Sequence, residues 1–454
     1  MRASIGPAGK ATAGPWSCRG RGRGRRRLGR VAGVAGAAAA LVMGVSACTS
    51  AHSSSSAAAG GSQPTVPPGM SCAWPAEFSA QTDNIAFPDA AEAYFLQPIV
   101  ASAGTRIVLS GRFPDARYAS VQVYTPGGVG ASLDDYRIAP QPGSVNPWQQ
   151  RAAPGGRFTV TIGPDPASGQ ANTLPLPAGT TSQHPGYLMY RVYLPAGGGG
   201  LSAVPVPVLM VEQGGSARTL PACPSHNAPV RPPAVSGSAA SAAGAGGSGA
   251  AAPPPRQLEF FKPPQSMFNN AGLANADTSY VLAYLVRPPA PDVVVVTAKA
   301  PTFASGSHPS AWPARDEDVR YWSMCIGLLA PPTQVVANKL PGGGTDYGCR
   351  ADEATALNAA GDYTYVIGSE SQRAAISRVP SVTFLPFSTT QASRLYLLAL
   401  RNVLVSSSFA HSPQGVTQSD DPAVAATVMG SYYPRAVACP LATLTAKGPQ
   451  ACPG

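Results

Sequence analysis

Residues that could do catalytic or metal chemistry are scattered along this chain and do not form a recognised motif. The five histidines lie in linker or turn-like sequence, and no H-E-x-x-H or H-x-H spacing places two of them on one element. A G-x-S-x-G motif is absent, so an α/β-hydrolase nucleophile has no candidate. Ser323 recurs in a related stretch as Ser120, and we interpret both as structural hydroxyls on strands. The sequence therefore predicts no metal site, cofactor or catalytic residue.

Three tryptophans are the best candidates for ligand contact. Trp148, Trp312 and Trp322 lie in or beside predicted loops and insertions. Exposed aromatic side chains at such places contact ligands, sugars or partner proteins. For each tryptophan taken singly, core packing is the favoured interpretation.

Two arginines recur at equivalent places in the chain. Arg117 begins the run Arg-Tyr-Ala-Ser, and Arg320 begins Arg-Tyr-Trp-Ser, each at the start of a predicted strand. One interpretation is a structural ion pair at a strand end, with Asp135 and Asp346 as candidate partners. The other is direct contact with an anionic ligand.

The N-terminal segment indicates where the protein resides. Seven arginines from Arg19 to Arg30 precede a small-residue apolar run over residues 31–47, which predicts a secretory signal peptide. The run ends in Val-Ser-Ala before Cys48, and this resembles the lipobox of bacterial lipoproteins. The resemblance implies cleavage before Cys48 and a lipid on its sulfur. We therefore expect a mature protein held by that lipid at the extracytoplasmic face of the cell membrane.

Removing the signal peptide changes the charge balance. The whole chain has a formal charge of +10, but nine of its 32 Lys and Arg residues and none of its 22 acids lie in residues 1–47. The mature chain thus keeps 23 basic against 22 acidic side chains. A nucleic-acid-binding protein shows a basic domain surface, and this near-neutral total argues against nucleic acid as the partner.

Six cysteines remain after Cys18 and Cys48 are set aside. An even number in an exported chain predicts disulfides, although six cysteines allow 15 pairings. We prefer the pairs that close the first domain and two local loops, and a reduced core thiol at Cys325 is the alternative. The preferred pairs are Cys72–Cys223, Cys325–Cys349 and Cys439–Cys452.

Composition divides the mature chain into two predicted β domains. Residues 48–71 and 228–257 are rich in Ser, Ala, Gly and Pro and are expected to be a tether and a linker. The second contains a literal G-x-G-x-x-G, but no strand precedes it, so we do not interpret it as a dinucleotide site. The predicted domains are residues 72–227 and 258–454.

The two domains are predicted to be diverged copies of one module. Six sequence blocks recur in the same order with similar gaps, and the second copy has an insertion over residues 302–319. The matched blocks are 107–114 with 294–301, 117–120 with 320–323, 133–136 with 344–347, 156–163 with 361–368, 174–177 with 384–387, and 187–194 with 395–402.

Most of the repeated blocks have the features of β-strands. They are short, rich in Val, Ile, Tyr, Thr and Phe, and bounded by Gly, Pro, Asp or Asn. We therefore predict an all-β fold of two tandem β-sandwich-like domains. A single helix is expected from Pro422 to Met429, capped by Asp421.

The repeated blocks resemble an uncharacterised bacterial β-sandwich module, a domain of unknown function. The second half is also similar to actinobacterial exported proteins of unknown function, through Arg-Tyr-Trp-Ser-Met-Cys and Asp-Tyr-Thr-Tyr-Val. These resemblances imply a fold and no activity.

The preferred function is a lipid-anchored, non-catalytic binding module of the cell envelope. Its partner would be an envelope glycan, lipid or protein. One alternative is an envelope hydrolase with its site at the domain interface or in the 302–319 insertion. The other is a structural envelope component.

Overall fold

The computed structural model describes residues 70–164, 170–197, 204–228, 258–264, 273–391, 395–417 and 420–453. By their contacts, all of these residues group together in one unit, within the range 62–454. The predicted signal peptide, Cys48, and nearly all of the tether and linker lie outside the described residues. Within the described ranges, no helix has the length and apolar character needed to cross a membrane.

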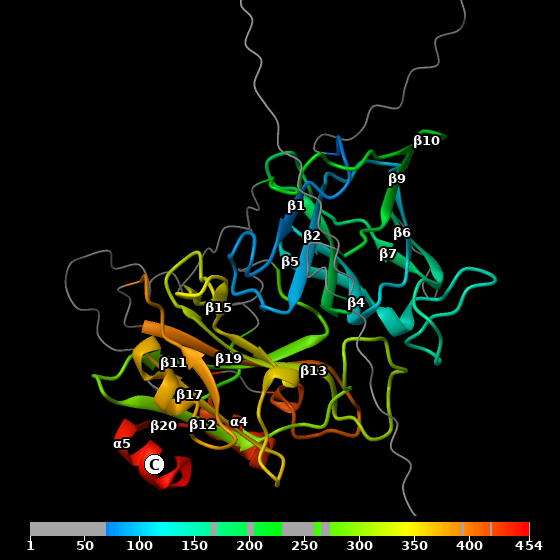
Figure 1. Ribbon diagram of the computed structural model, residues 1–454. Helices are drawn as coiled ribbons and strands as arrows, with labels where there is room; N and C mark the ends of the chain where they lie inside the picture. The colour runs from blue at the N-terminus through cyan, green and yellow to red at the C-terminus, as the bar shows by residue number, and fades with distance from the viewer. Residues whose placement is uncertain are drawn as a thin grey trace, which may run out of the picture. The chain divides into compact units, whose positions relative to one another are not determined.

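The fold is mostly β, as predicted, and the first half is built from two five-stranded sheets (Figure 1). Their neighbours pair antiparallel, except that β6 and β7 are parallel. One sheet has the order β1 (Ala76–Phe78), β2 (Glu92–Ile99), β8 (Gly186–Pro195), β4 (Ala116–Thr125) and β5 (Gly128–Asp134). The other has the order β10 (Ser216–Thr219), β9 (Val208–Gln213), β3 (Arg106–Arg112), β6 (Arg157–Gly163) and β7 (Thr173–Pro175).

The second half repeats this plan with two four-stranded sheets. One has the order β11 (Thr278–Val286), β19 (Leu395–Val405), β13 (Val319–Leu328) and β16 (Cys349–Ala351). The other has β18 (Thr383–Pro386), β17 (Asp362–Gly368), β12 (Val293–Lys299) and β20 (Arg435–Cys439), with β17 and β18 again parallel. A hairpin of β14 (Ala337–Lys339) and β15 (Thr345–Tyr347) is added. Strand for strand, β2-β8-β4-β5 corresponds to β11-β19-β13-β16, so the two halves share one topology.

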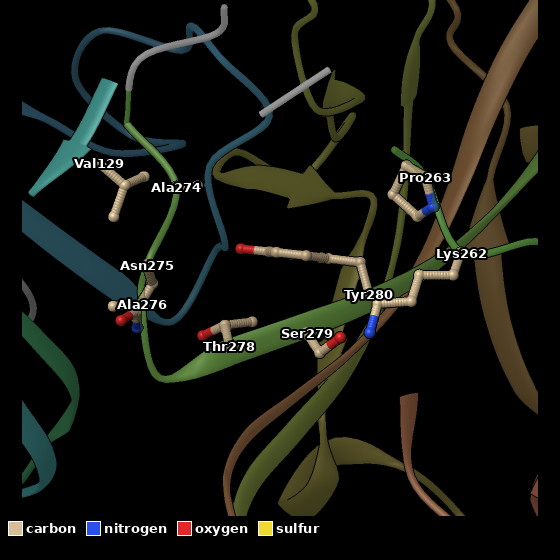
Figure 2. Close-up of a pocket in the computed structure, with 9 residues that line it drawn as sticks. All are labelled: Val129, Lys262, Pro263, Ala274, Asn275, Ala276, Thr278, Ser279 and Tyr280. Carbon is tan, nitrogen blue, oxygen red and sulfur yellow. The ribbon is translucent and has the colours of Figure 1, made fainter. Parts of the chain in front are cut away.

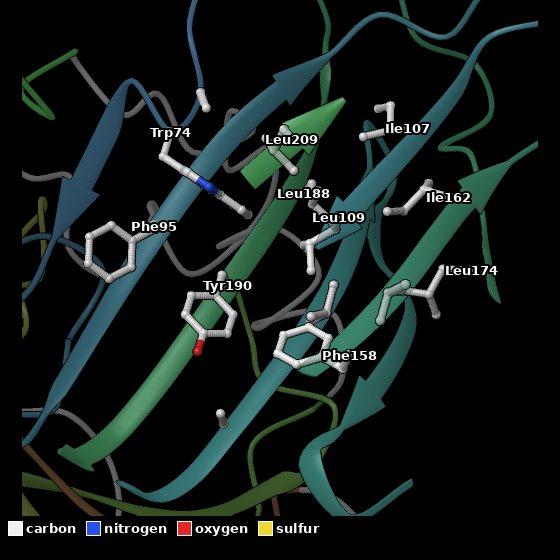
Figure 3. Packing of buried hydrophobic residues seen from close by; sticks show 14 of the residues in the cluster. Trp74, Phe95, Ile107, Leu109, Phe158, Ile162, Leu174, Leu188, Tyr190 and Leu209 are labelled. Atoms are coloured by element: carbon white, nitrogen blue, oxygen red, sulfur yellow. The ribbon is translucent and has the colours of Figure 1, made fainter. Parts of the chain in front are cut away.

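Each half is a sandwich because alternating side chains of its two sheets meet in one core. Along β6, Phe158, Val160 and Ile162 are buried while the residues between them are not. They share a cluster with Phe95 and Tyr190 from the facing sheet, as Figure 3 shows. The period-two pattern in the sequence therefore correctly identified the core face of this strand.

Helices are short and peripheral to the sheets. The predicted helix is α4, Pro422–Met429, and the backbone N–H of Ala423 donates to the Asp421 carboxylate at 2.9 Å, as expected for the cap. Gly430 ends it with a positive φ. The other helices in the described part of the chain are α3 (Arg373–Ile376) and α5 (Leu441–Lys447). Its 3₁₀ turns are Asp135–Arg137, Asp352–Ala354, Glu370–Gln372, Pro413–Gly415, Gly430–Tyr432 and Pro449–Ala451.

The six cysteines form three disulfides, and the pairs are those preferred from the sequence. Cys72–Cys223 joins the two ends of the first half. Cys325–Cys349 joins directly opposed residues of β13 and β16, so Cys325 is not a reduced core thiol. Cys439–Cys452 ties the C-terminal residues to β20. In the chain-entropy model, closing a loop as long as the first stabilises the fold by about 5 kcal/mol.

The two sandwiches contact each other through a loop of the first half. Backbone N–H groups of Ala86 and Phe87 donate to the carbonyls of Pro332 and Thr333 at 2.9 and 2.7 Å. The Phe87 ring packs onto the backbone of Gly327 in β13, where an added Cβ would lie 2.3 Å from the ring. Glycine is thus required at this position so that the loop can dock.

Replacing Gly327 with alanine is expected to destabilise the protein by about 1–3 kcal/mol, the range for overpacking a tight site. The added methyl group would clash with Phe87 and would also lie 2.6 Å from the Gln334 carbonyl oxygen. Chemical denaturation of the purified protein measures the loss. Gly342→Ala is the matched control, because nothing lies within 4 Å of its added Cβ. Equal stability of both variants would contradict this docking contact.

Candidate functional site

The contact between the sandwiches is a layer of buried charged side chains. Four arginines and four carboxylates lie in it, each at most 1% exposed. The central strands β8 and β19 supply two of the arginines and are buried on both faces over most of their length. We call this layer the seam; its charged residues are Asp89, Glu92, Arg117, Asp135, Arg191, Arg320, Asp352 and Arg401.

Two of the seam's ion pairs are reciprocal between the halves. Arg117 of the first half donates to the Asp352 carboxylate at 2.6 Å, and Arg320 of the second half donates to Asp135 at 3.2 Å. Each carboxylate also accepts a backbone N–H from its own half. Ala119 donates to Asp135 at 2.7 Å, and Trp322 donates to Asp352 at 3.1 Å. Asp135 and Asp352 are therefore equivalent positions of the two copies.

This arrangement corrects the partners expected for the two arginines. Arg320 does pair with Asp135, but Arg117 pairs with Asp352 and Glu353, and Asp346 instead holds Arg350 and Arg373. Aligning the two halves of the sequence made Asp346 the equivalent of Asp135, because an Asp-Tyr pair occurs in both halves. In the structure that match falls in the added hairpin β14–β15.

A second cluster in the seam surrounds Arg191 and Arg401. Arg191 lies 2.8 Å from Glu92, and Arg401 lies 3.1 Å from Asp89 and 3.7 Å from Glu92. Hydroxyl groups also donate to these two carboxylates. Tyr94 donates to Glu92, and Ser323 and Tyr321 donate to Asp89 at 2.6 and 2.9 Å. Ser323 thus has the structural role that the sequence predicted for it.

Burial shifts the pKa values of the seam's acids upward. It raises the pKa of Asp135 to about 7 and that of Asp352 to about 6, in each case against the opposing effect of the paired arginine. It raises the pKa of Glu92 to about 8, opposed by Arg191 and Arg401. At the margin of the seam, burial and then the neighbouring Asp134 raise the pKa of Asp277 to about 6.

The three tryptophans singled out as ligand contacts are buried. Trp148 and Trp322 are 0% exposed and belong to the two sandwich cores, and Trp312 is 7% exposed. Trp148 donates its indole N–H to the Arg117 carbonyl at 3.0 Å, and the Trp312 ring lies 5.1 Å from the Arg320 guanidinium. The core-packing interpretation therefore describes Trp148 and Trp322, and Trp312 packs against the seam.

The 302–319 insertion connects the second sandwich to the first. The Gly306 carbonyl accepts from Arg117 Nε at 2.6 Å, and the Trp312 N–H donates to the Trp148 carbonyl at 2.8 Å. His308 lies 2.8 Å from Asp115. These contacts use the insertion's polar groups to hold the halves together.

Two hollows meet at Ala276, beside the seam. The smaller, about 110 Å³, has walls from both halves, and Figure 2 shows Val129 of β5 facing Thr278 and Tyr280 of β11. Its Lys262 ammonium donates to the Pro413 and Val416 carbonyls at 3.0 and 2.7 Å, and burial lowers the pKa of that lysine. The larger hollow, about 420 Å³, includes Asp277, which accepts the Tyr118 hydroxyl at 2.8 Å. Neither hollow is lined by a histidine or tryptophan of the described residues.

Asp89, Cys325 and Cys349 are the one group of described residues with the proximity of metal ligands. Both sulfur atoms belong to the Cys325–Cys349 disulfide, so neither is a thiolate that can bind a metal ion. This group therefore does not form a metal centre.

Comparison with protein-family models and with curated proteins found no match. Among solved structures, the chain is similar to a putative uncharacterized protein from Burkholderia cenocepacia, with 14% identity, a TM-score of 0.48, and coverage of 83% of this chain and 84% of that one. It is also similar to a protein from Vibrio parahaemolyticus, with 12% identity, a TM-score of 0.38, and coverage of 78% and 91%. Both are uncharacterised bacterial proteins, and similarities at this level support no conclusion about activity.

Replacing Arg117 with methionine should destabilise the protein by about 3–5 kcal/mol, because it leaves the buried Asp352 without its cation. Equilibrium unfolding in guanidinium measures the loss. Arg106→Met is the control, since Arg106 forms a 3.5 Å pair with Glu212 at the surface and is 51% exposed. Such pairs contribute about 0–1 kcal/mol. A loss below about 1 kcal/mol for Arg117→Met would show that the seam pair is not needed for stability.

Stability should fall as the pH rises from about 5 to 8. In the unfolded chain, carboxyl groups lose their protons near about pH 4. In the folded protein, Asp277 and Asp352 lose theirs near pH 6 and Asp135 near pH 7, because their pKa values are raised. The folded state therefore binds more protons in this window and is favoured at its acid end. Thermal unfolding at pH 5 and pH 8 checks the direction.

Asp277→Asn removes one of these titrating groups and should reduce the difference between the two midpoints. Asp83→Asn, at an exposed position, should leave the difference unchanged. A midpoint that rises from pH 5 to pH 8 would refute the sign of the effect.

Proposed function

We propose that this chain is an exported lipoprotein whose two sandwiches form one rigid, non-catalytic binding module on the outer side of the cell membrane. The seam carries the proposal. A hydrolase site at the contact between the halves would need an open cleft there. Paired charges, the docked loop and the insertion fill most of this contact. A protein that keeps this contact closed is suited to presenting its outer surfaces to a partner.

The disulfides support export. All six cysteines of the described residues are paired, and such bonds persist in oxidising compartments outside the cytoplasm. The lipid anchor rests on the sequence before Cys48. Residues 49–69 lie between the proposed anchor and the described body, and their length sets an upper limit of about 70 Å on the separation of the two.

The partner is proposed to be a component of the envelope, with glycan, lipid and protein as the classes. The hydrolase alternative has less support, because His308 and the Trp312 backbone are engaged in contacts between the halves. Gly306 of the same insertion binds Arg117.

The Cys48→Ala variant tests the proposal. Expressed in its own host, the wild-type protein should fractionate with membranes, and its intact mass should exceed that of the mature polypeptide by a diacylglycerol and an acyl chain. The variant should leave the membrane fraction. Native mass spectrometry of the wild-type protein then reports any retained small ligand.

Membrane association of Cys48→Ala that survives high salt would refute the lipid anchor. Cys18→Ala, within the predicted signal peptide, is the control and should behave as the wild type. Turnover of an envelope polymer by the purified protein would refute the non-catalytic assignment.

A further inference from the structure

The sheet β10-β9-β3-β6-β7 has one face in the core and the other in solvent. On β3, Ile107 and Leu109 are buried, whereas Arg106 and Arg112 are exposed. Strand register carries this alternation across the sheet. We call the solvent-facing residues of its three central strands the outer sheet face: Arg106, Val108, Ser110, Arg112, Arg157, Thr159, Thr161, Val208, Met210 and Glu212.

Two arginines of the outer sheet face carry positive charge that no carboxylate of the described residues neutralises. Register places Arg112 directly opposite Arg157. Neither has a carboxylate partner among the described residues, and Arg112 donates only to the Gly155 carbonyl at 2.9 Å. Directly opposed like charges destabilise a sheet, so an anion lying over both guanidinium groups would relieve their repulsion.

An apolar strip lies beside these arginines. Val208 is 54% exposed, and register pairs it with Ser110. Two residues further along β9, Met210 pairs with Val108 of β3, and both side chains are half-buried. An apolar strip bordered by cationic side chains is the composition by which peripheral proteins bind the interface of an anionic membrane.

The chain from the proposed anchor enters the described body next to this strip. The indole N–H of Trp74 donates to the carbonyl of Pro207 at 2.7 Å, and Pro207 directly precedes Val208. The backbone N–H of Ala73 donates to the Pro221 carbonyl at 2.8 Å. The first described residues, Met70 to Trp74, therefore pack into the core of the first sandwich beside the start of β9.

We propose that the outer sheet face binds the surface of an anionic bilayer, with Arg112 and Arg157 contacting lipid phosphates and Val208 entering the headgroup region. This deepens the proposed function by naming the membrane itself as a partner. A few arginines bind such a surface weakly on their own, but a tether holds the face at high local concentration. Docking fixes which side of the body faces the cell and leaves the second sandwich directed outward.

Vesicle co-sedimentation of the mature polypeptide from Thr49 tests the proposal. This protein lacks Cys48, so its binding is independent of whether the lipid anchor exists. At low salt and high lipid concentration, where weak untethered binding is detectable, it should bind vesicles of phosphatidylglycerol, bind them less as salt increases, and not bind phosphatidylcholine vesicles. Arg112→Gln combined with Arg157→Gln should weaken binding about 30-fold, as expected for two arginines near an anionic surface.

Two further variants separate charge from structure. Arg112→Lys with Arg157→Lys should retain binding, because the charge is kept. Arg378→Gln with Arg435→Gln removes two exposed charges from the second half and should also retain it. Thermal midpoints equal to the wild type show that each variant is folded. Absent binding to phosphatidylglycerol, equal binding to both lipids, or binding unaffected by the Arg112 and Arg157 glutamine variant would each overturn the proposal.

Discussion

The structure depends on keeping the seam's buried charges paired. Moving a carboxylate or guanidinium group out of water costs several kcal/mol, and only a well-placed counter-charge with further hydrogen bonds offsets that cost. Here the counter-charges of Asp135 and Asp352 come from the opposite sandwich. Within the closed contact, removing one member of either pair would leave the other buried without a counter-charge. Each sandwich therefore supplies counter-charges that the buried groups of the other require.

The strands could be predicted because their information is local. Alternating apolar residues, bounding turn residues and the recurrence of blocks mark β3, β6 and their counterparts β12 and β17. The helix after Asp421 was predicted from its cap and its terminating glycine. The seam could not be predicted in this way, since period-two patterning shows which side chains share a face but not what covers it. Trp148 and Trp322 could thus be named as candidate ligand contacts beside loops, although both lie in the cores.

One sequence signal for the seam was available. Arg191 and Arg401 each interrupt an otherwise apolar strand, and register shows that they are equivalent, because Ser120 lies opposite Arg191 and Ser323 lies opposite Arg401. A charge within such a strand needs a buried partner. The block comparison missed the equivalence because it aligned the last strands two residues out of step. A similar alignment error made Asp346, and not Asp352, the equivalent of Asp135. A match of two or three residues is therefore weaker evidence of equivalence than strand register.

The closed seam also limits where binding can occur. Since the inner faces of both halves are occupied by each other, a partner must use loops, sheet edges or the remaining outer sheet surfaces. The face with Arg112 opposite Arg157 has charge without a carboxylate partner among the described residues, and it lies near the contact of Trp74 with Pro207. A rigid body converts attachment at that one face into a defined orientation of the whole molecule. If the first sandwich rests on the membrane, the hollows beside Ala276 and the loops of the second sandwich are presented together in a fixed geometry, which a flexible pair of domains could not provide.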